Sequence, residues 1–321
     1  MYKIAYFTVQ PVCIDVVVGL APPEFSVTAR PATVSEKEKI EIIKDADFLM
    51  LHGGGRITDA CLRAATRLKH YQLFAAGFDK ENLPLLAELG IPISNIPGEL
   101  LQSVVEMVIA MILALNRRLI QMDKGTREGK WRWDLSTGMD HFDLAEKTVG
   151  IIGFGRLGRM LARRLRGFDT PILYYDVTAY PEAEKELNAR RVALDVLLKE
   201  SDIVSINTPL TPATRGLIGK REISLMKPSA LLINTGRGPV VDEEALITAL
   251  KANQIRGAGL DVFAKEPASA DNPLFKLENV VVSPHLAGTT YESVVRRAKF
   301  AYQNFQRVLA GQEPLHLIKT S

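Results

Sequence analysis

Three glycines of the chain stand in a regular spacing between an apolar segment and an amphipathic one. Gly153, Gly155 and Gly158 form G-x-G-x-x-G, with TVGII before it and a helical pattern containing Leu157 and Leu161 after it. The first glycine permits a tight turn, the second lets a pyrophosphate approach the backbone, and the third lets helix and strand pack closely. The pattern alone is weak. Its place between a strand and a helix predicts a dinucleotide site, with the pyrophosphate at the start of the helix.

An acidic residue closes the next apolar segment, PILYYD, which ends in Asp176. A carboxylate at this place accepts hydrogen bonds from both hydroxyls of an adenosine ribose and repels a 2′-phosphate, so the pattern predicts NAD rather than NADP. Arg190 and Arg191 follow too far along the chain to change this prediction from sequence alone. The alternative is that Asp176 is a solvated acid or a helix cap at a strand end.

Three further apolar segments each end near one polar residue suited to chemistry. ALLINTGRG presents Arg237, GAGLDVFAKEP presents Glu266 and NVVVSPH presents His285. Ligands of open parallel sheets bind beyond the carboxyl ends of the strands, so these residues are expected where the nicotinamide lies. Taken singly, each has a plainer interpretation: a surface arginine after a turn, the start of a helix at Glu-Pro, and a structural histidine.

The order of these motifs resembles the D-isomer-specific 2-hydroxyacid dehydrogenase family. The resemblance covers nearly the whole chain: AAGFDKENLPLLAELGIPISNIPG is similar to the substrate-loop region of the family and SVVEMVIAMILALNRR to its inter-domain helix. It implies an NAD-dependent oxidoreductase that transfers a hydride between nicotinamide and a small D-2-hydroxy acid or 2-keto acid. The particular acid stays open, because glyoxylate, hydroxypyruvate, phosphohydroxypyruvate and branched or aromatic keto acids all fit.

The resemblance also assigns roles to the three polar residues. Arg237 would hold the carboxylate and keto oxygen of the substrate, since a guanidinium offers two parallel donors. His285 would be the acid/base that exchanges a proton with the substrate oxygen. Glu266 would hydrogen-bond the other ring nitrogen and stabilise the imidazolium.

Further residues are expected at the cofactor and the substrate. Asp261 would contact the nicotinamide carboxamide, and Thr208 and Pro209 would lie in the loop passing the cofactor. The backbone of Ala76 and Gly77 would receive the substrate carboxylate. The complete expected cofactor set is Gly153, Gly155, Arg156, Leu157, Gly158, Asp176, Thr208, Pro209, Thr235, Asp261 and Ser103.

The segment His52-Gly53-Gly54-Gly55-Arg56 follows the apolar segment DFLML. Its glycine backbone at Gly54 and the side chain of Arg56 are candidate substrate contacts; the alternative is a strand-to-helix loop with a solvated arginine. H-G-G-G also occurs in esterases, but the chain has no G-x-S-x-G nucleophile motif, which excludes that hydrolase class.

Short apolar runs alternate with helical patterns along most of the chain, which predicts parallel sheets with right-handed crossovers. The expected fold class is α/β, with two doubly wound parallel-sheet domains. A Rossmann NAD-binding domain at 99–289 is expected to be inserted into a flavodoxin-like substrate-binding domain formed by 1–98 plus 290–321. Pro97-Gly98 ends a strand before a long apolar helix at 99–118, and a last helix at 289–309 is expected to return to the first domain.

Composition limits the other classes. A net charge of +3 predicts no nucleic-acid partner, and the two cysteines form no C-x-x-C or zinc pattern, so we expect a cytoplasmic protein without a metal. The apolar core Met107–Leu115 is about half of the ~20 residues needed to span a membrane, so a buried helix is expected. The resemblance implies a homodimer.

Two other functions stay open. One is an NAD-sensing regulatory module of the same fold, similar to the transcriptional corepressors that resemble this family. The other is a related dehydrogenase for phosphite. Formate is disfavoured, because formate dehydrogenases carry Gln where this chain has Glu266.

Overall fold

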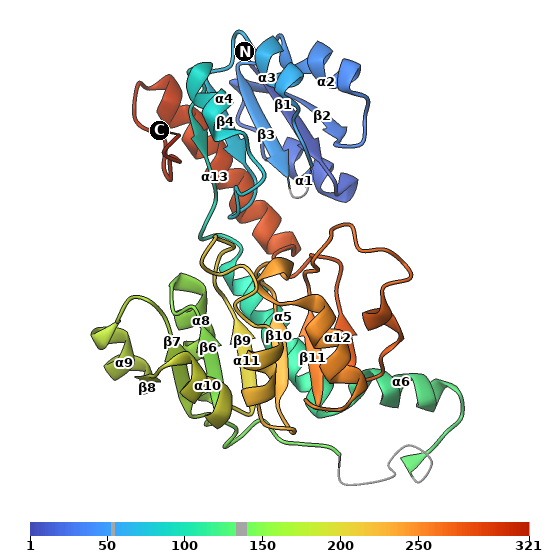
Figure 1. Cartoon of the computed structure of the whole chain (residues 1–321). Coiled ribbons are helices and arrows are strands. Elements are labelled where there is room, and N and C mark those ends of the chain that lie inside the picture. Colours follow the sequence, from blue (N-terminus) through green and yellow to red (C-terminus); the bar gives the residue numbers. More distant parts are fainter. Residues whose placement is uncertain (53–54, 133–139, 321) are drawn as a thin grey trace. The chain divides into compact units, whose positions relative to one another are not determined.

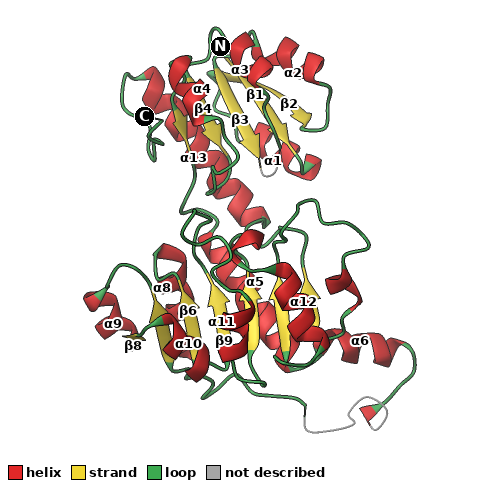
Figure 2. Cartoon of the chain, viewed as in Figure 1, coloured by secondary structure: helices red, strands yellow, loops and turns green. Residues whose placement is uncertain are grey.

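The computed structural model describes residues 1–52, 55–132 and 140–320 (Figure 1). They form two compact units: an N-terminal unit of Met1–Leu100 with Thr289–Ser321, and a central unit of Leu101–Gly288. In each unit a layer of parallel strands has helices on both faces (Figure 2). The expected fold class, α/β with two doubly wound parallel sheets, is confirmed.

The N-terminal unit contains a five-stranded parallel sheet in the order β2-β1-β3-β4-β5. This is the flavodoxin-like order of a doubly wound sheet. Its strands are β1 Tyr2–Thr8, β2 Phe25–Pro31, β3 Phe48–His52, β4 His70–Leu73 and β5 Ile93–Ser94, and its helices are α1 Ile14–Gly19, α2 Glu36–Ile43, α3 Asp59–Ala64, α4 Leu83–Glu88 and α13 Tyr291–Leu309.

Two apolar cores cover the two faces of this sheet. One lies under α2, α3 and α4, and the other lies under α1 and α13. On the α13 side, the Phe48 and Phe305 rings stack at 4.4 Å between centroids. The Tyr302 hydroxyl donates to the Val17 carbonyl at 2.6 Å. The last helix is therefore part of the core of the N-terminal unit, although 188 residues of the central unit (Leu101–Gly288) come before it in sequence.

The central unit contains a seven-stranded parallel sheet in the order β12-β11-β10-β9-β6-β7-β8. The chain leaves β6 toward one edge and β9 toward the other, so the carboxyl ends of these two strands form a topological switch point, where ligands of such sheets bind. The strands are β6 Val149–Ile152, β7 Ile172–Tyr175, β8 Ala189–Arg191, β9 Ile203–Ile206, β10 Leu231–Asn234, β11 Gly257–Leu260 and β12 Val280–Val282, and the helices are α5 Leu101–Asn116, α6 Leu119–Arg127, α8 Arg156–Leu165, α9 Pro181–Leu187, α10 Leu194–Glu200, α11 Lys220–Leu225 and α12 Glu243–Lys251.

The apolar helix expected at 99–118 is α5. Its side chains Val105, Val108 and Ile112 are at most 1% exposed and join a core with the central sheet. The expectation of a buried helix is confirmed. Among the described helices none combines the length and the apolarity that crossing a membrane requires.

His70 is a buried polar residue of β4 whose two ring nitrogens find no hydrogen-bond partner within the described part of the chain. Burial lowers the pKa of His70 from 6.5 to about 4. The folded protein therefore resists protonation of this ring, while the unfolded chain accepts a proton below about pH 6.5. The neutral His70 ring therefore contributes fully to the free energy of unfolding above pH 6.5, and this contribution is lost progressively as the pH falls toward 4.

We expect His70 alone to lower the free energy of unfolding by about 2 kcal/mol when the pH is lowered from 7 to 5. Urea unfolding of the wild type and of His70→Leu at both pH values measures the effect. The leucine variant should lose less stability on acidification than the wild type by that amount. Equal losses in the two proteins would show that His70 does not contribute.

Candidate active site

The glycine turn lies between β6 and α8, at the switch point of the central sheet. Gly153 has a φ of +90°, and a Cβ there would lie 2.9 Å from backbone atoms of Asn207 and Thr208. At Gly158 a Cβ would lie 2.2 Å from the Gly153 carbonyl oxygen. Any side chain at either position would therefore collide with backbone.

Gly155 differs, because nothing lies within 4 Å of the position its Cβ would take. The open space is at the N-cap of α8, a ten-residue helix whose first turn contains Arg156 and Leu157. The first N–H groups of a helix have no partner within the helix and favour an anion. These residues fit the pyrophosphate of a dinucleotide.

Asp176 follows β7 and lies beside the glycine turn. Its Oδ2 accepts from the Phe154 N–H at 2.7 Å and its Oδ1 from the Thr178 N–H at 2.9 Å. A carboxylate has about four acceptor sites, so two amides leave room for ribose hydroxyls. Arg191 of β8 donates to the Asp176 and Val177 carbonyl oxygens at 2.9 and 3.2 Å, which places a guanidinium next to this strand end.

The turn after β10 carries Thr235 and Arg237. Asn234 holds it from both sides: Oδ1 accepts from the Gly236 N–H and Nδ2 donates to the Arg237 carbonyl, each at 3.1 Å. The buried Thr235 hydroxyl has no hydrogen-bond partner among the described residues. Because buried polar atoms are nearly always paired, this oxygen also fits a bound cofactor. The half-buried Arg237 guanidinium donates to the Gly236 carbonyl at 2.9 Å.

The structure brings His285 and Glu266 together. The His285 Nδ1 lies 2.9 Å from the Glu266 Oε2, and the other carboxylate oxygen accepts from the Phe263 N–H at 3.2 Å. The histidine side chain is 45% exposed and the glutamate side chain 22%. With Nδ1 paired to the carboxylate, Nε2 is the nitrogen available to exchange a proton with a ligand.

Asp261 fastens the loop that carries His285. Its Oδ1 accepts from the Ser283 hydroxyl at 2.6 Å and the Leu286 N–H at 2.9 Å, and its Oδ2 accepts from the Ala287 N–H at 3.0 Å. The Asp261 carbonyl also accepts from the His285 N–H at 2.8 Å. Burial raises the pKa of Asp261, although these donors act in the opposite direction. The carboxylate fixes the histidine backbone, which has a left-handed φ of +57°.

In the N-terminal unit, the loop after β4 has three successive carbonyl groups that accept hydrogen bonds from the rest of the unit. The donors are the Arg297 Nη1 to Phe74 O at 2.8 Å, the Ile96 N–H to Ala75 O at 2.9 Å and the Asn95 Nδ2 to Ala76 O at 2.6 Å.

In a trans peptide the C=O and the following N–H point in opposite directions. The N–H groups of Ala75, Ala76 and Gly77 are therefore directed away from these donors. Each of these residues is partly exposed, and within the described ranges none of the three N–H groups donates a hydrogen bond. The loop presents a row of available donors suited to an anion.

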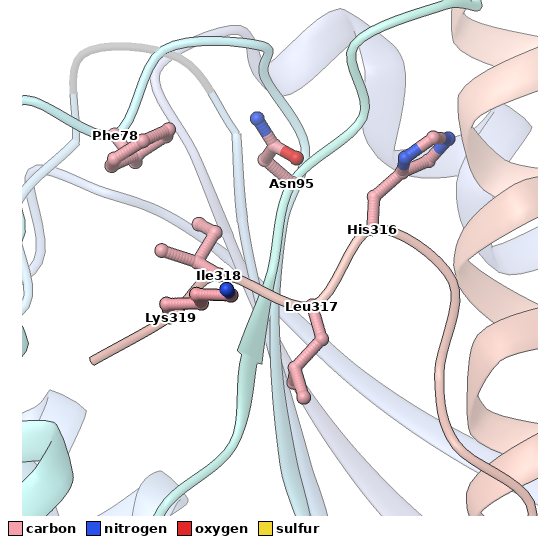
Figure 3. Close-up of a pocket in the computed structure, with 6 residues that line it drawn as sticks. All are labelled: Phe78, Asn95, His316, Leu317, Ile318 and Lys319. Atoms are coloured by element: carbon pink, nitrogen blue, oxygen red, sulfur yellow. The ribbon is translucent and has the colours of Figure 1, made fainter. Parts of the chain in front are cut away.

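A hollow of about 340 Å³ borders the same loop, lined by Phe78, Asn95 and the chain end from His316 to Lys319 (Figure 3). Asn95 reaches it from the side of the loop where it donates to the Ala76 carbonyl. The available N–H groups point the other way. We therefore do not assign the substrate to this hollow.

The expected substrate contacts of the loop after β3, Gly54 and Arg56, stay predictions. His52 is turned into the core, where its Nε2 lies 3.0 Å from the Arg297 Nη1 and its Nδ1 3.2 Å from the Thr8 hydroxyl. Arg56 is exposed, and its carbonyl accepts from the Lys39 Nζ at 3.1 Å. Gly54 lies outside the described residues.

Comparison with known proteins identifies the family. Residues 109–287 match the family model described as "D-isomer specific 2-hydroxyacid dehydrogenase, NAD binding domain". A glyoxylate reductase from Korarchaeum cryptofilum (strain OPF8) is 40% identical over 289 residues, which cover 89% of this chain and 87% of that protein. The chain belongs to the D-isomer specific 2-hydroxyacid dehydrogenase family.

Two further similarities agree with this family. Glyoxylate/hydroxypyruvate reductase B from Pectobacterium carotovorum subsp. carotovorum (strain PC1) is 40% identical over 264 residues, 82% of each chain. The apo-structure of D-lactate dehydrogenase from Escherichia coli superposes with a TM-score of 0.88 at 26% identity, covering 99% of this chain and 100% of that one. The predicted family and oxidoreductase class are confirmed: the 2-hydroxyacid dehydrogenase is an enzyme that uses a nicotinamide dinucleotide and acts on 2-keto or 2-hydroxy acids.

The individual site residues of this 2-hydroxyacid dehydrogenase stay predictions. The structure places Gly153, Asp176 and Thr208 around one turn, and pairs Glu266 with His285. Ser103 is buried in α5. Sequence analysis missed Asn234 behind the Arg237 turn and Arg297 behind the β4 loop, and it set aside Arg191, which the structure places beside Asp176. Among the described residues no group of three or more His, Cys, Asp or Glu side chains is arranged to hold a metal.

Proposed function

We propose that this enzyme reduces a small 2-keto acid of the glyoxylate or hydroxypyruvate class with NADH. The observation that carries the proposal is the contact between His285 and Glu266 at 2.9 Å. The two residues follow the neighbouring strands β12 and β11. The glycine turn lies at the switch point of the same sheet. The named activities of the relatives at 40% identity support the substrate class.

Each residue of the site would have a separate role in binding or proton transfer. Arg237 binds the substrate carboxylate and keto oxygen through two donors, which fixes one pose. His285 holds a proton at Nε2 and gives it to the keto oxygen, and the charge of Glu266 stabilises the imidazolium beforehand. The N–H groups of Ala76 and Gly77 receive the carboxylate. The nicotinamide, when bound, supplies the hydride.

The test is NADH oxidation by the purified protein with a panel of 2-keto acids: glyoxylate, hydroxypyruvate, pyruvate, phosphohydroxypyruvate and a branched-chain keto acid. We expect the two smallest polar acids to give the highest kcat/KM. Absence of turnover with every acid would favour the NAD-sensing module instead. Turnover of phosphite alone would favour the phosphite-type enzyme.

We propose NADH as the preferred cofactor because of Asp176. Its charge opposes a 2′-phosphate, and Asp176→Ala should narrow the NADH/NADPH preference in kcat/KM by about tenfold, the scale of one nearby charge. Glu182→Gln, which removes a charge from the neighbouring helix α9, is the matched control and should leave the ratio unchanged. A wild type that uses both cofactors equally would contradict the assignment. Arg191 would then be the residue to test for a 2′-phosphate contact.

We also propose that the enzyme is a homodimer. Leu119 and Ile120 of α6 are 57% and 56% exposed in the single chain, and Trp131 beyond this helix is 56% exposed. Neighbouring exposed apolar side chains of this size are typical of a subunit interface. Light scattering at micromolar concentration should give the mass of two chains. The Leu119→Asp substitution should lower the measured mass toward that of one chain. A monomeric wild type would contradict the proposal.

A further inference from the structure

Arg297 is a buried arginine of α13 that no sequence motif singled out. Only 3% of the residue is exposed. Its Nη1 donates to the Phe74 carbonyl at 2.8 Å and lies 3.0 Å from the His52 Nε2. The Nε and Nη2 atoms each lie 3.3 Å from oxygens of Ser293, and the guanidinium stacks over the Phe74 ring at 5.0 Å. The side chain is therefore held at the carboxyl ends of β3 and β4.

The charge of Arg297 has no negative partner in the described part of the chain. Its hydrogen-bond partners there are a carbonyl, a histidine ring and the oxygens of one serine, and no carboxylate is among them. Burial and the neighbouring guanidinium lower the pKa of His52 to about 3, so the imidazole is neutral. Burial lowers the pKa of Arg297 to about 10, which leaves the guanidinium charged at neutral pH.

A buried and uncompensated cation is unusual, because removal of a charge from water is costly unless an anion or a set of hydrogen bonds offsets it. Here hydrogen bonds fill most of the donor positions, yet the net charge remains. The loop directly after Phe74 presents the available N–H groups of Ala75, Ala76 and Gly77. The guanidinium and the available N–H groups therefore lie at the same end of the sheet, on opposite sides of the Phe74–Ala75 peptide, and both favour an anion there.

We propose that Arg297 is a positioning residue for the substrate carboxylate. It holds the Phe74 carbonyl so that the next N–H groups face the anion, and its unpaired charge lowers the energy of a carboxylate bound there. Asn95 has the same orienting function at the Ala76 carbonyl, without a charge. The inference rests on the proposed function, since it assigns residues to one end of the same substrate.

The experiment compares Arg297→Met, which keeps an unbranched apolar stem without the charge, with Arg297→Lys, which keeps the charge. Arg307→Met is the matched control: Arg307 lies on the same helix, ten residues or about 15 Å along, and donates to the Glu313 carbonyl at the surface. The readouts are KM and kcat for glyoxylate, the Kd of NADH, and the Kd of oxamate, a carboxylate-bearing analogue, from the enzyme–NADH complex.

We expect Arg297→Met to raise KM and the oxamate Kd by about 10- to 100-fold, with kcat and the NADH Kd within about threefold of wild type. Arg297→Lys should recover most of the affinity, and Arg307→Met should equal wild type. This split separates a role in carboxylate binding from a merely structural one. Unchanged oxamate binding by a folded Arg297→Met protein would overturn the inference.

Asn95→Ala keeps the test decisive if Arg297→Met does not fold. Asn95 is only half-buried, and its replacement releases one carbonyl without exposing a buried charge. We expect its KM and oxamate Kd to rise about fivefold, the worth of one oriented hydrogen bond. Unchanged values would overturn the inference. Oxamate binding also separates this inference from the proposed function, because it requires no turnover.

Discussion

Replacing His285 with Ala is expected to lower kcat for 2-keto acid reduction by about 10²–10⁴, the usual contribution of a positioned proton donor. This corresponds to about 3–5 kcal/mol of activation free energy. The geometry behind the expectation is the 2.9 Å contact of Nδ1 with Glu266, which orients the ring and leaves Nε2 for the substrate. The Kd of NADH should change little, because the glycine turn and Asp176 are separate from this ring.

Glu266→Gln is the companion variant, because an amide keeps a hydrogen bond to Nδ1 but loses the charge. It should reduce kcat less than His285→Ala, because the amide still orients the ring but no longer places a negative charge beside the imidazolium. His316→Ala, an exposed histidine of the chain end, is the control and should leave kcat unchanged. Near-normal turnover by the His285→Ala protein would refute the proposed mechanism.

Much of the fold follows from local patterns in the sequence. The inner strands of the central sheet are short apolar runs buried on both faces, and such runs alternate with helical patterns from Val149 onward. Two strands lack this apolar pattern for a common reason. β2 and β8 are edge strands with exposed side chains, among them Arg30 and Arg190, so they carry no continuous apolar signal.

The site was predictable only where a motif is local. The glycine turn and the residues at the strand ends are visible in sequence because each depends on a few neighbouring positions. The Arg297–His52 contact joins residues 245 positions apart, and nothing in either segment signals the other. Arg191 was set aside as too distant in sequence for a similar reason, because the short strand β8 returns it to Asp176. Pairing in space, rather than residue type, was the missing information.

Replacing Arg237 is the second change with a large expected effect, and it acts mainly on KM rather than on kcat. Arg237→Lys keeps a cation but loses the planar pair of donors, so substrate binds less tightly and in more than one pose. We expect KM to rise about 10- to 100-fold and kcat to fall about tenfold, which lowers kcat/KM by about 10²–10³. The Kd of NADH should remain near the wild-type value.

The turn itself should survive this replacement. Asn234 fastens it through the backbone of Gly236 and Arg237, and these two hydrogen bonds remain when the arginine side chain, which donates to the Gly236 carbonyl, is replaced. This makes Arg237→Ala a suitable host for chemical rescue, because added guanidinium has room where the side chain was. We expect millimolar guanidinium to restore part of kcat/KM in Arg237→Ala and none in His285→Ala. Arg221→Ala, which removes an exposed arginine paired with Asp195, is the control and should be neither impaired nor rescued.

If Arg237→Ala kept a wild-type KM for every acid of the panel, the carboxylate would have to be bound without this guanidinium, and the assignment of Arg237 would be wrong.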